Sequence, residues 1–143
     1  MEGIYTGYTN YFYKTKDLKK FDAPFVNEVK RIVAASGVPL GNWDGKGKPK
    51  ITDTIISLNG VGEDSCESFV ITAEYEKKDD FFNKGFNFCK TDRKPYDAVV
   101  KAILMSAKKH GVIDRWKFDG DDTETEYIAG KQLYDCAVGK KSV

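Results

Sequence analysis

The segment from residue 95 to residue 110 constrains the fold of this chain more than any other part. Its apolar side chains recur at helical spacing and share one face, and they are Tyr96, Val100, Ile103, Leu104 and Ala107. Lys94, Lys101 and Lys108 follow one another at heptad spacing, which predicts that they lie together on the opposite, solvated face. Gly111 is a suitable C-terminal stop. A helix with one apolar face must pack on another layer of secondary structure.

The remaining elements alternate between strand-like and helical patterns. In chain order, the sequence predicts a strand over 4–14, a helix over 22–36, a hairpin of strands over 54–59 and 68–75, the helix over 95–110, a strand over 112–118 and a helix over 123–137. These strands are too few for a doubly wound parallel sheet. We therefore expect a single α+β domain over residues 1–143, with a four-stranded, mostly antiparallel sheet and about three helices packed on one face.

The composition fits a globular protein and limits the kinds of partner. Of the 143 residues, 41% are hydrophobic and 31% are charged, and the formal net charge is +1. A near-neutral chain has no general electrostatic attraction to a nucleic-acid polymer or to an anionic membrane, so we expect neither as a partner. No apolar run approaches the roughly 20 residues of a membrane span, and no signal-peptide pattern is visible, so we expect a cytoplasmic protein.

The possible metal ligands are few and widely spaced. Cys66, Cys89 and Cys136 form no CxxC pair, and His110 is the single histidine of the sequence. A structural zinc site needs about four such ligands at close spacing. We therefore expect free thiols, no bound metal and no cofactor.

The first candidate site lies at the start of the long amphipathic helix. A helix start exposes unpaired N–H groups and the positive end of the helix dipole, and Lys90, Arg93 and Lys94 surround it. This combination suits a phosphate or carboxylate group of a ligand. Thr91 is a candidate helix cap, and Asp97 is a candidate acid or base. The alternative interpretation is an ordinary capped helix with a solvated basic face.

The second candidate site is the tyrosine-rich N-terminal strand. Alternation along a strand puts Tyr5, Thr9, Tyr11 and Tyr13 on one face and Tyr8, Asn10 and Phe12 on the other. Aromatic rings can stack on a base, so Tyr8, Tyr11 and Phe12 are candidates for stacking. Asn10 is a candidate for hydrogen bonding to the edge of the base. The alternative is a sheet face packed on helices, with the hydroxyl groups reaching water.

The third candidate is Trp43, in a loop predicted over 41–50 from its three glycines and its proline. A tryptophan there can act as a lid or an interface anchor, or it can pack back onto the core. Asn59, at the end of the predicted strand over 54–59, is a further candidate for reading a base edge. Residues 76–85 are polar and are predicted to form an excursion between strands.

Several segments of the chain resemble, in the same order along the sequence, those of a known family. They are Thr6-Gly7-Tyr8-Thr9-Asn10-Tyr11-Phe12, Gly37-Val38-Pro39-Leu40, Ile51-Thr52-Asp53, Leu58-Asn59-Gly60, Glu67-Ser68-Phe69-Val70 and Phe88-Cys89-Lys90-Thr91-Asp92-Arg93-Lys94-Pro95-Tyr96-Asp97. On these segments the chain resembles an uncharacterised family of small phage and bacterial proteins that begin Met-Gly-Tyr-Thr-His-Tyr-Trp. Asn10 and Phe12 stand where that pattern has His and Trp, so a catalytic or metal-binding His is not carried over. The resemblance implies a phage or bacterial cytoplasmic setting and brings no defined activity.

The two strongest candidate sites coincide with the two strongest family segments, which favours one shared pocket. The sequence predicts a binding protein that sequesters a small phosphorylated, nucleotide-like ligand without turnover. The predicted type of site is similar to that of phage sponge proteins, which sequester nucleotide immune signals, although no sequence motif is shared. We also expect a homo-oligomer whose interface completes the pocket. The alternatives are a hydrolase of a similar ligand, for which Asp97 is the best carboxylate, and a protein-interaction module built on Trp43 and the aromatic strand.

Overall fold

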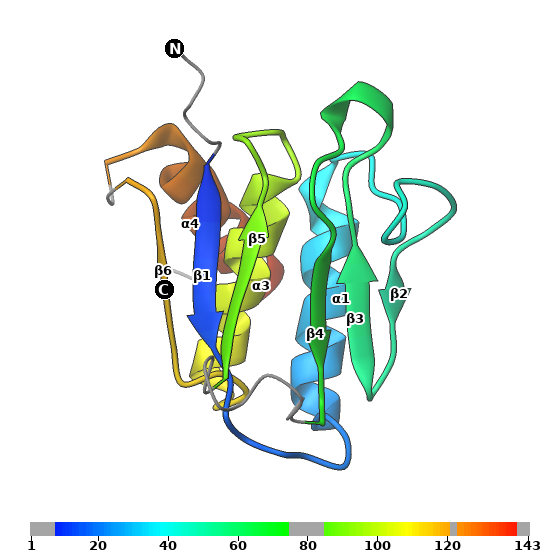
Figure 1. Cartoon of the computed structure of the whole chain (residues 1–143), viewed down its shortest axis with the longest axis vertical. Helices are drawn as coiled ribbons and strands as arrows, with labels where there is room; N and C mark the ends of the chain where they lie inside the picture. The colour runs from blue at the N-terminus through cyan, green and yellow to red at the C-terminus, as the bar shows by residue number, and fades with distance from the viewer. Residues whose placement is uncertain (1–7, 75–84, 121–122, 140–143) are drawn as a thin grey trace.

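The computed structural model describes residues 8–74, 85–120 and 123–139 (Figure 1). In chain order, the elements are β1 (Thr9–Tyr13), α1 (Ala23–Ser36), β2 (Lys50–Ile51), β3 (Ile55–Leu58), a 3-10 helix (Gly62–Asp64), β4 (Phe69–Thr72), β5 (Phe86–Lys90), α3 (Asp97–Lys109), β6 (Arg115–Phe118) and α4 (Thr125–Ala137). The three predicted helices and the strands at β1, β3, β4 and β6 are confirmed. Residues 4–7 of the first predicted strand and 76–84 of the predicted excursion lie outside the described residues.

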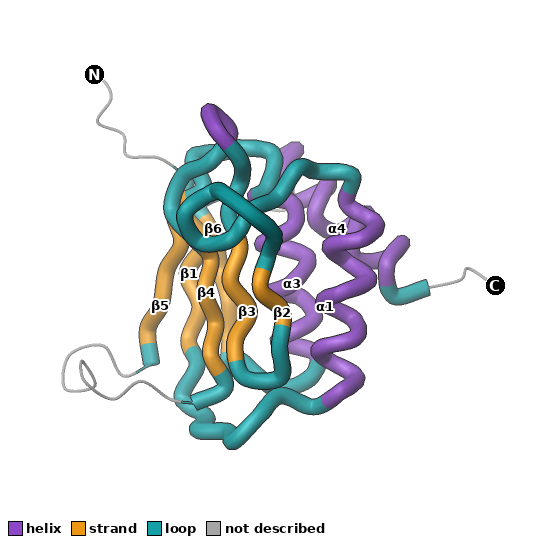
Figure 2. Tube along the Cα trace, turned by 90° about the vertical axis from the view of Figure 1, so that its right-hand side faces the viewer, coloured by secondary structure: helices purple, strands orange, loops and turns teal. Residues whose placement is uncertain are grey.

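The strands of the described residues form two three-stranded antiparallel sheets, so the prediction of one four-stranded sheet is wrong. One sheet has the order β5-β1-β6, and the other has the order β2-β3-β4. They lie side by side, with β5 next to β4, and form one layer (Figure 1). Figure 2 shows α1, α3 and α4 together on one side of that layer. The α+β class and the packing of helices on one face are therefore confirmed.

The error in strand number comes from β2 and β5. β2 has only two residues and begins at the last residue of the segment predicted as a glycine-rich loop. β5 covers a segment for which no strand is predicted, and only its last residue, Lys90, is a predicted site residue. β5 pairs with the distant β1, placing Cys89 opposite Asn10. A short strand whose partner is far away in the sequence has little local signal, because strand preference depends on its neighbours in the sheet.

Two sets of hydrogen bonds join the sheets at opposite ends of the layer. At one end, the Glu67 backbone N–H donates to the Lys90 carbonyl oxygen at 3.1 Å. At the other end, the Lys14 ammonium donates to the Ala73 carbonyl oxygen at 2.8 Å. Lys14 is almost fully buried there, and this burial lowers the pKa of its ammonium group. The polar contacts therefore fix the two sheets against each other.

The hydrophobic core lies between the strand layer and the helices. Phe12 from β1 and Phe69 from β4 meet in it with ring centroids 5.7 Å apart, so both sheets share one core. The apolar face predicted for the long helix is fully buried and consists of Tyr96, Val100, Ile103, Leu104 and Ala107. The helical periodicity of the sequence therefore identified the packing face of α3.

The prediction that Lys101 lies on the solvated face of this helix is wrong. Lys101 is completely buried, whereas Lys108 is exposed as expected. The cause is α4, which packs on α3 through Gly130. A Cβ at position 130 would lie 2.8 Å from the Lys101 Cβ, so only a glycine permits this approach. The periodicity of one helix does not reveal that a second helix covers its polar face.

The helix ends follow the local sequence signals only in part. α1 begins directly after Asp22 with Pro24 in its first turn, and it ends at Gly37, whose φ of 67° is left-handed. α3 begins at Asp97 with Tyr96 as its N-cap. Pro95 therefore precedes the helix, and Thr91 is not its cap.

Within the helix layer, the buried carboxylate of Glu28 links α1 to the C-terminal end of α3. Its carboxylate accepts a hydrogen bond from Ser106 Oγ at 2.6 Å and lies 3.0 Å from Lys109 Nζ and 3.1 Å from His110 Nε2. Burial acts to raise the pKa of Glu28, but these hydrogen bonds outweigh it and hold the pKa below its ordinary value. The carboxylate is thus a charged link between two helices.

Among the described residues, no helix is long and apolar enough to cross a bilayer. Cys66, Cys89 and Cys136 are free thiols. Burial raises the pKa of the Cys89 thiol. Within the same described part of the chain, no group of three or more His, Cys, Asp or Glu side chains is arranged to hold a metal ion.

Candidate functional site

A cluster of buried polar side chains lies between β1 and the start of α3. Asn10 Nδ2 and Thr91 Oγ1 both donate to Asp97 Oδ1, at 2.8 Å and 2.6 Å. Lys101 Nζ donates to Asn10 Oδ1 at 2.9 Å and lies 2.9 Å from Asp97 Oδ2. All four side chains are fully buried. Burial lowers the pKa of Lys101, and the neighbouring Asp97 opposes this effect.

Tyr8 lies over this buried polar cluster, between two cations. Lys101 Nζ is 4.3 Å from the centroid of its ring, and Arg93 Cζ is 4.5 Å from the same centroid. The side chain is buried, its hydroxyl makes no hydrogen bond to the described residues, and burial raises its pKa, with Asp97 adding to the shift. A base could stack on this ring only by displacing one of the two cations.

Arg93 is already paired with carboxylates from α4 and its N-cap. Its Nη1 lies 3.0 Å from Glu124 Oε1 and 2.8 Å from Glu126 Oε1. The hydrogen bond from Arg93 to Glu124 raises the pKa of the guanidinium. Asp92 and Arg93 both have left-handed backbones, with φ of 54° and 58°, which residues other than glycine rarely adopt. This turn directs Arg93 across Tyr8 and toward α4.

The start of α3 is therefore more acidic than the sequence of the preceding loop suggests. Asp97 occupies the first turn of the helix, and the two glutamates arrive from a distant segment. A ligand anion would have to compete with both glutamates for Arg93. The arrangement joins β1, α3 and α4 as a structural connection, and it does not favour an anion at the helix start.

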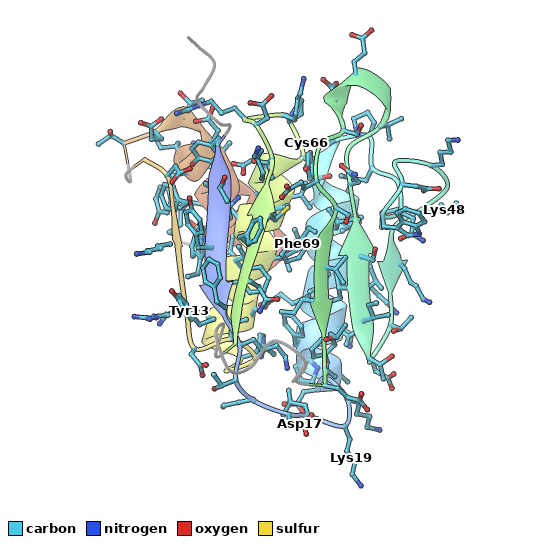
Figure 3. The ribbon with its side chains drawn as sticks, viewed as in Figure 1. Tyr13, Asp17, Lys19, Lys48, Cys66 and Phe69 are labelled. Carbon is cyan, nitrogen blue, oxygen red and sulfur yellow. The ribbon has the colours of Figure 1, made fainter. Side chains whose placement is uncertain are left out.

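Asn59 and Trp43 belong to two loops beside the other sheet. Asn59 Nδ2 donates to the carbonyl oxygens of Trp43 and Cys66, at 3.0 Å and 2.9 Å, and its Oδ1 accepts from the Cys66 backbone N–H. The Asn59 amide is therefore used to hold the loops together. The Trp43 side chain is 62% exposed and does not pack on the core. Figure 3 labels Lys48 and Cys66 in these two loops.

The predicted site residues thus fall into separate groups. Five of them gather in and over the buried polar cluster, and they are Tyr8, Asn10, Thr91, Arg93 and Asp97. Phe12 lies in the core, whereas Trp43 and Asn59 lie in the loops. Lys90 and Lys94 flank the turn before α3, and Tyr11 lies on the opposite side of β1. The strand alternation predicted for the described residues 8–13 is confirmed. It separates Tyr11 from Tyr8, Asn10 and Phe12.

The side of the β5-β1-β6 sheet that points away from the helices carries aromatic and basic residues. We call this side the open face. Alternation along the three strands places on it Tyr11 and Tyr13 from β1, Phe86, Phe88 and Lys90 from β5, and Arg115 and Lys117 from β6. Figure 3 labels Tyr13 near the end of β1. The open face unites residues from three separate regions of the sequence.

The rings of the open face contact one another across the strands. The Phe86 ring centroid lies 6.1 Å from that of Tyr11, 5.3 Å from that of Tyr13 and 6.0 Å from that of Phe88. The Arg115 guanidinium lies 4.2 Å above the centroid of the Tyr13 ring. Phe88 is 57% exposed, so much of its ring is accessible to solvent. These rings form an aromatic surface with one member accessible to a planar ligand.

The charge of the open face is mainly positive. Its charged side chains among the described residues are Lys90, Arg115, Lys117 and Asp119. Asp119 is engaged by the protein, since its Oδ1 accepts from the Tyr11 hydroxyl and its Oδ2 accepts from the Thr9 backbone N–H, both at 3.1 Å. Burial and the hydrogen bond to Asp119 raise the pKa of Tyr11. Arg115 and Lys117 are exposed and are placed to pair with an anion.

The sequence analysis identified Tyr11 and Lys90 in this group but not the rest. The missed residues are Tyr13, Phe86, Phe88, Arg115 and Lys117. The available signal was alternation, since aromatic residues flank Asn87 and basic residues flank Trp116. That signal shows which residues of one strand share a face. Only the register of β1 with β5 and β6 shows that the three sets lie beside one another.

Comparison with protein-family models, with curated proteins and with solved structures finds no match to this chain. The resemblance to the phage and bacterial family therefore stays a prediction. The chemistry of the side chains is therefore the basis for assigning a function.

Proposed function

We propose that this protein binds a small phosphorylated, nucleotide-like ligand on its open face and holds it without turnover. The observation that carries the proposal is the exposed ring of Phe88 within a group of four aromatic side chains, beside the exposed cations of β6. The open face replaces the α3 start as the proposed location, because Arg93 already has two carboxylate partners.

Aromatic rings on a sheet are a general means of binding bases. Base–aromatic stacking contributes about 1–3 kcal/mol per base, and it tolerates different bases because each has a π-face. Phe88 offers its ring to solvent, while Tyr11 and Phe86 support it from the neighbouring positions. A planar heterocycle that covers Phe88 would also remove an exposed apolar surface from water.

The cations of β6 supply partners for the phosphate. Lys117 lies opposite Tyr11 and Arg115 lies opposite Tyr13, so each cation is one strand away from an aromatic side chain. Adjacent strands are about 4.8 Å apart, so β5, which carries Phe88, lies about 9.6 Å from β6 across β1. The long side chains of Arg115 and Lys117 can cover part of that distance toward the phosphate. Charge-assisted hydrogen bonds from Arg and Lys to phosphate are stronger than neutral ones.

Binding without turnover is favoured because the carboxylates near the two candidate sites are already engaged by other groups of the protein. Asp119 accepts hydrogen bonds on both oxygens. Asp97, the carboxylate predicted for the hydrolase alternative, is fully buried and paired with Lys101. A general acid or base must lie within hydrogen-bond reach of the proton that it transfers. Asp97 is buried away from the open face, and Asp119 on that face is already held by hydrogen bonds from the protein.

Native mass spectrometry with a panel of nucleoside mono- and diphosphates tests the proposal, and it also reports the oligomeric state. We expect a bound adduct with the unchanged mass of the nucleotide. Phe88→Ala should weaken binding about 5- to 150-fold, the equivalent of one lost stacking contact. Ile128→Ala, which truncates another exposed apolar side chain on α4, is the matched control and should have no effect.

Three results would contradict the proposal. Binding that survives Phe88→Ala but is lost in Trp43→Ala would place the ligand at the loops beside the other sheet. A product of altered mass would support the hydrolase alternative. If no nucleotide binds and Phe88→Ala instead abolishes capture of a protein, the interaction-module alternative is correct.

A further inference from the structure

The open face carries the same combination of side chains twice. Each combination is a row across the three strands, with an aromatic residue on β5, a tyrosine on β1 and a cation on β6. The first row is Phe88, Tyr11 and Lys117, and the second row is Phe86, Tyr13 and Arg115. The strand register alone produces this repetition, since members of the two rows are two residues apart on every strand.

The distance between the rows has a consequence for the ligand. Two residues along a strand span about 6.6–6.8 Å, and the Phe86 and Phe88 ring centroids lie 6.0 Å apart. Successive bases of a stacked strand are only about 3.4 Å apart along its axis. Two bases that each contact one row therefore cannot stay stacked on each other. They must be separated, as in an extended single strand.

The two rows present different surfaces to a base. In the first row, Phe88 is 57% exposed, so its ring is directly accessible. In the second row, the Arg115 guanidinium lies over the Tyr13 ring at 4.2 Å. A planar guanidinium supported by a ring can itself stack on a base, as arginine does in recognition of single-stranded RNA. Both rows therefore offer a planar group for stacking.

The position of the cations suits a linked ligand. Arg115 and Lys117 lie on the same strand and the same face, so both are placed on one side of the aromatic residues. Their spacing, about 6.6–6.8 Å, places one positive charge beside each row. A backbone that runs along β6, with its bases directed over β1 and β5, would meet a cation at each nucleotide.

We propose that the open face binds two consecutive nucleotides of a linear chain, joined by a phosphodiester, with one base on each row. This inference rests on the proposed function, because it requires that the open face bind nucleotides. It adds that the unit recognised is a dinucleotide with separated bases. A base-paired duplex does not fit, since its bases are stacked on one another and are not available to the rows.

Isothermal titration of four probes tests the inference: adenosine monophosphate, the linear dinucleotide pApA, a tetranucleotide of the same base and a short duplex. We expect pApA to bind at least about 10-fold more tightly than the monophosphate, because a second stacking contact is formed. The tetranucleotide should gain no more than about 3-fold over pApA, the statistical advantage of three overlapping dinucleotide positions on one site. The duplex should bind more weakly than pApA.

Substitutions test whether each row binds one base. Arg115→Ala removes the planar group of the second row and should reduce the affinity for pApA to near that for the monophosphate. The monophosphate affinity should stay within about 3-fold, because Phe88 in the first row remains. Lys50→Ala on β2 is the control for loss of one exposed positive charge and should retain the advantage of pApA.

The possible failures are distinguishable. If pApA and the monophosphate bind equally, the dinucleotide inference is wrong while the proposed function stands. If the duplex binds as tightly as pApA, or the tetranucleotide binds far more tightly, the face follows a phosphate backbone without two base positions, and the inference is also wrong. If none of the four probes binds, both the inference and the proposed function are wrong.

Discussion

Replacement of Lys101 by methionine provides a direct test of the buried polar cluster. The Lys101 side chain is fully buried, and its ammonium lies 2.9 Å from Asp97 Oδ2 and 2.9 Å from Asn10 Oδ1. Lys101→Met preserves the length of the aliphatic chain but leaves the Asp97 carboxylate buried without its cation. Breaking a buried ion pair in this way costs about 3–5 kcal/mol, mainly because a charge is left uncompensated in the interior.

The structure favours the lower part of this range. Asp97 retains its hydrogen bonds from Asn10 Nδ2 and Thr91 Oγ1 in the variant, and these bonds partly stabilise the charge. We therefore expect a loss of about 3 kcal/mol in the free energy of unfolding. For a chain of this length, this corresponds to a fall in Tm of about 10 °C.

Urea unfolding followed by circular dichroism at pH 7 measures this change. The urea midpoint should fall while the dependence of unfolding free energy on urea stays constant. The double variant Asp97→Asn/Lys101→Met removes both charges, so it should be more stable than Lys101→Met by at least about 1 kcal/mol. A Lys101→Met protein within about 0.5 kcal/mol of the original would refute the reasoning, since only exposed substitutions are that mild.

Three further predictions concern a helix contact, a carboxylate and the open face. Gly130→Ala should destabilise the protein by about 1–3 kcal/mol in thermal unfolding, because the added Cβ would lie 2.8 Å from the Lys101 Cβ; an unchanged or higher Tm would show that α4 does not pack so closely. Glu28→Gln should lower the unfolding free energy at pH 7 by about 1–2 kcal/mol. Because the pKa of Glu28 is lowered by folding, its contribution is complete above about pH 4.3 and is lost as the pH falls through the folded-state pKa. Urea midpoints of the original and variant proteins should therefore converge as the pH falls below the ordinary range of a glutamate, and a constant difference would contradict this. Phe88→Ala should change the unfolding free energy by less than about 0.5 kcal/mol, so a large loss of stability would mean that this ring is structural.

The fold shows which patterns are informative within a single chain. The packing face of α3 follows from periodicity, because residues three and four apart share a helix face whatever the rest of the protein does. β5 carries an equally regular alternation, yet it becomes a strand through its pairing with β1. The sequence analysis accordingly found the helices and underestimated the number of strands.

The candidate site divides in the same way. Asp97 was recognised as a carboxylate of interest, but its partner Asn10 lies 87 positions earlier, and that contact determines that the carboxylate is structural. Arg93 was recognised as an exposed cation, but the glutamates that neutralise it come from the segment that starts α4. In both cases the residue type was informative, whereas its availability to a ligand depended on distant segments.

The sequence by itself determined the α+β class, the apolar faces of the helices and which residues of β1 share a side. These properties depend on local geometry, which repeats every 3.6 residues in a helix and every two residues in a strand. Only the tertiary structure decided that Lys101 is buried, that β1 lies between β5 and β6, and that aromatic and basic residues meet on the open face. The reason is that strand order, register and helix coverage are set by contacts between distant segments, whose energies are not encoded in any one of them.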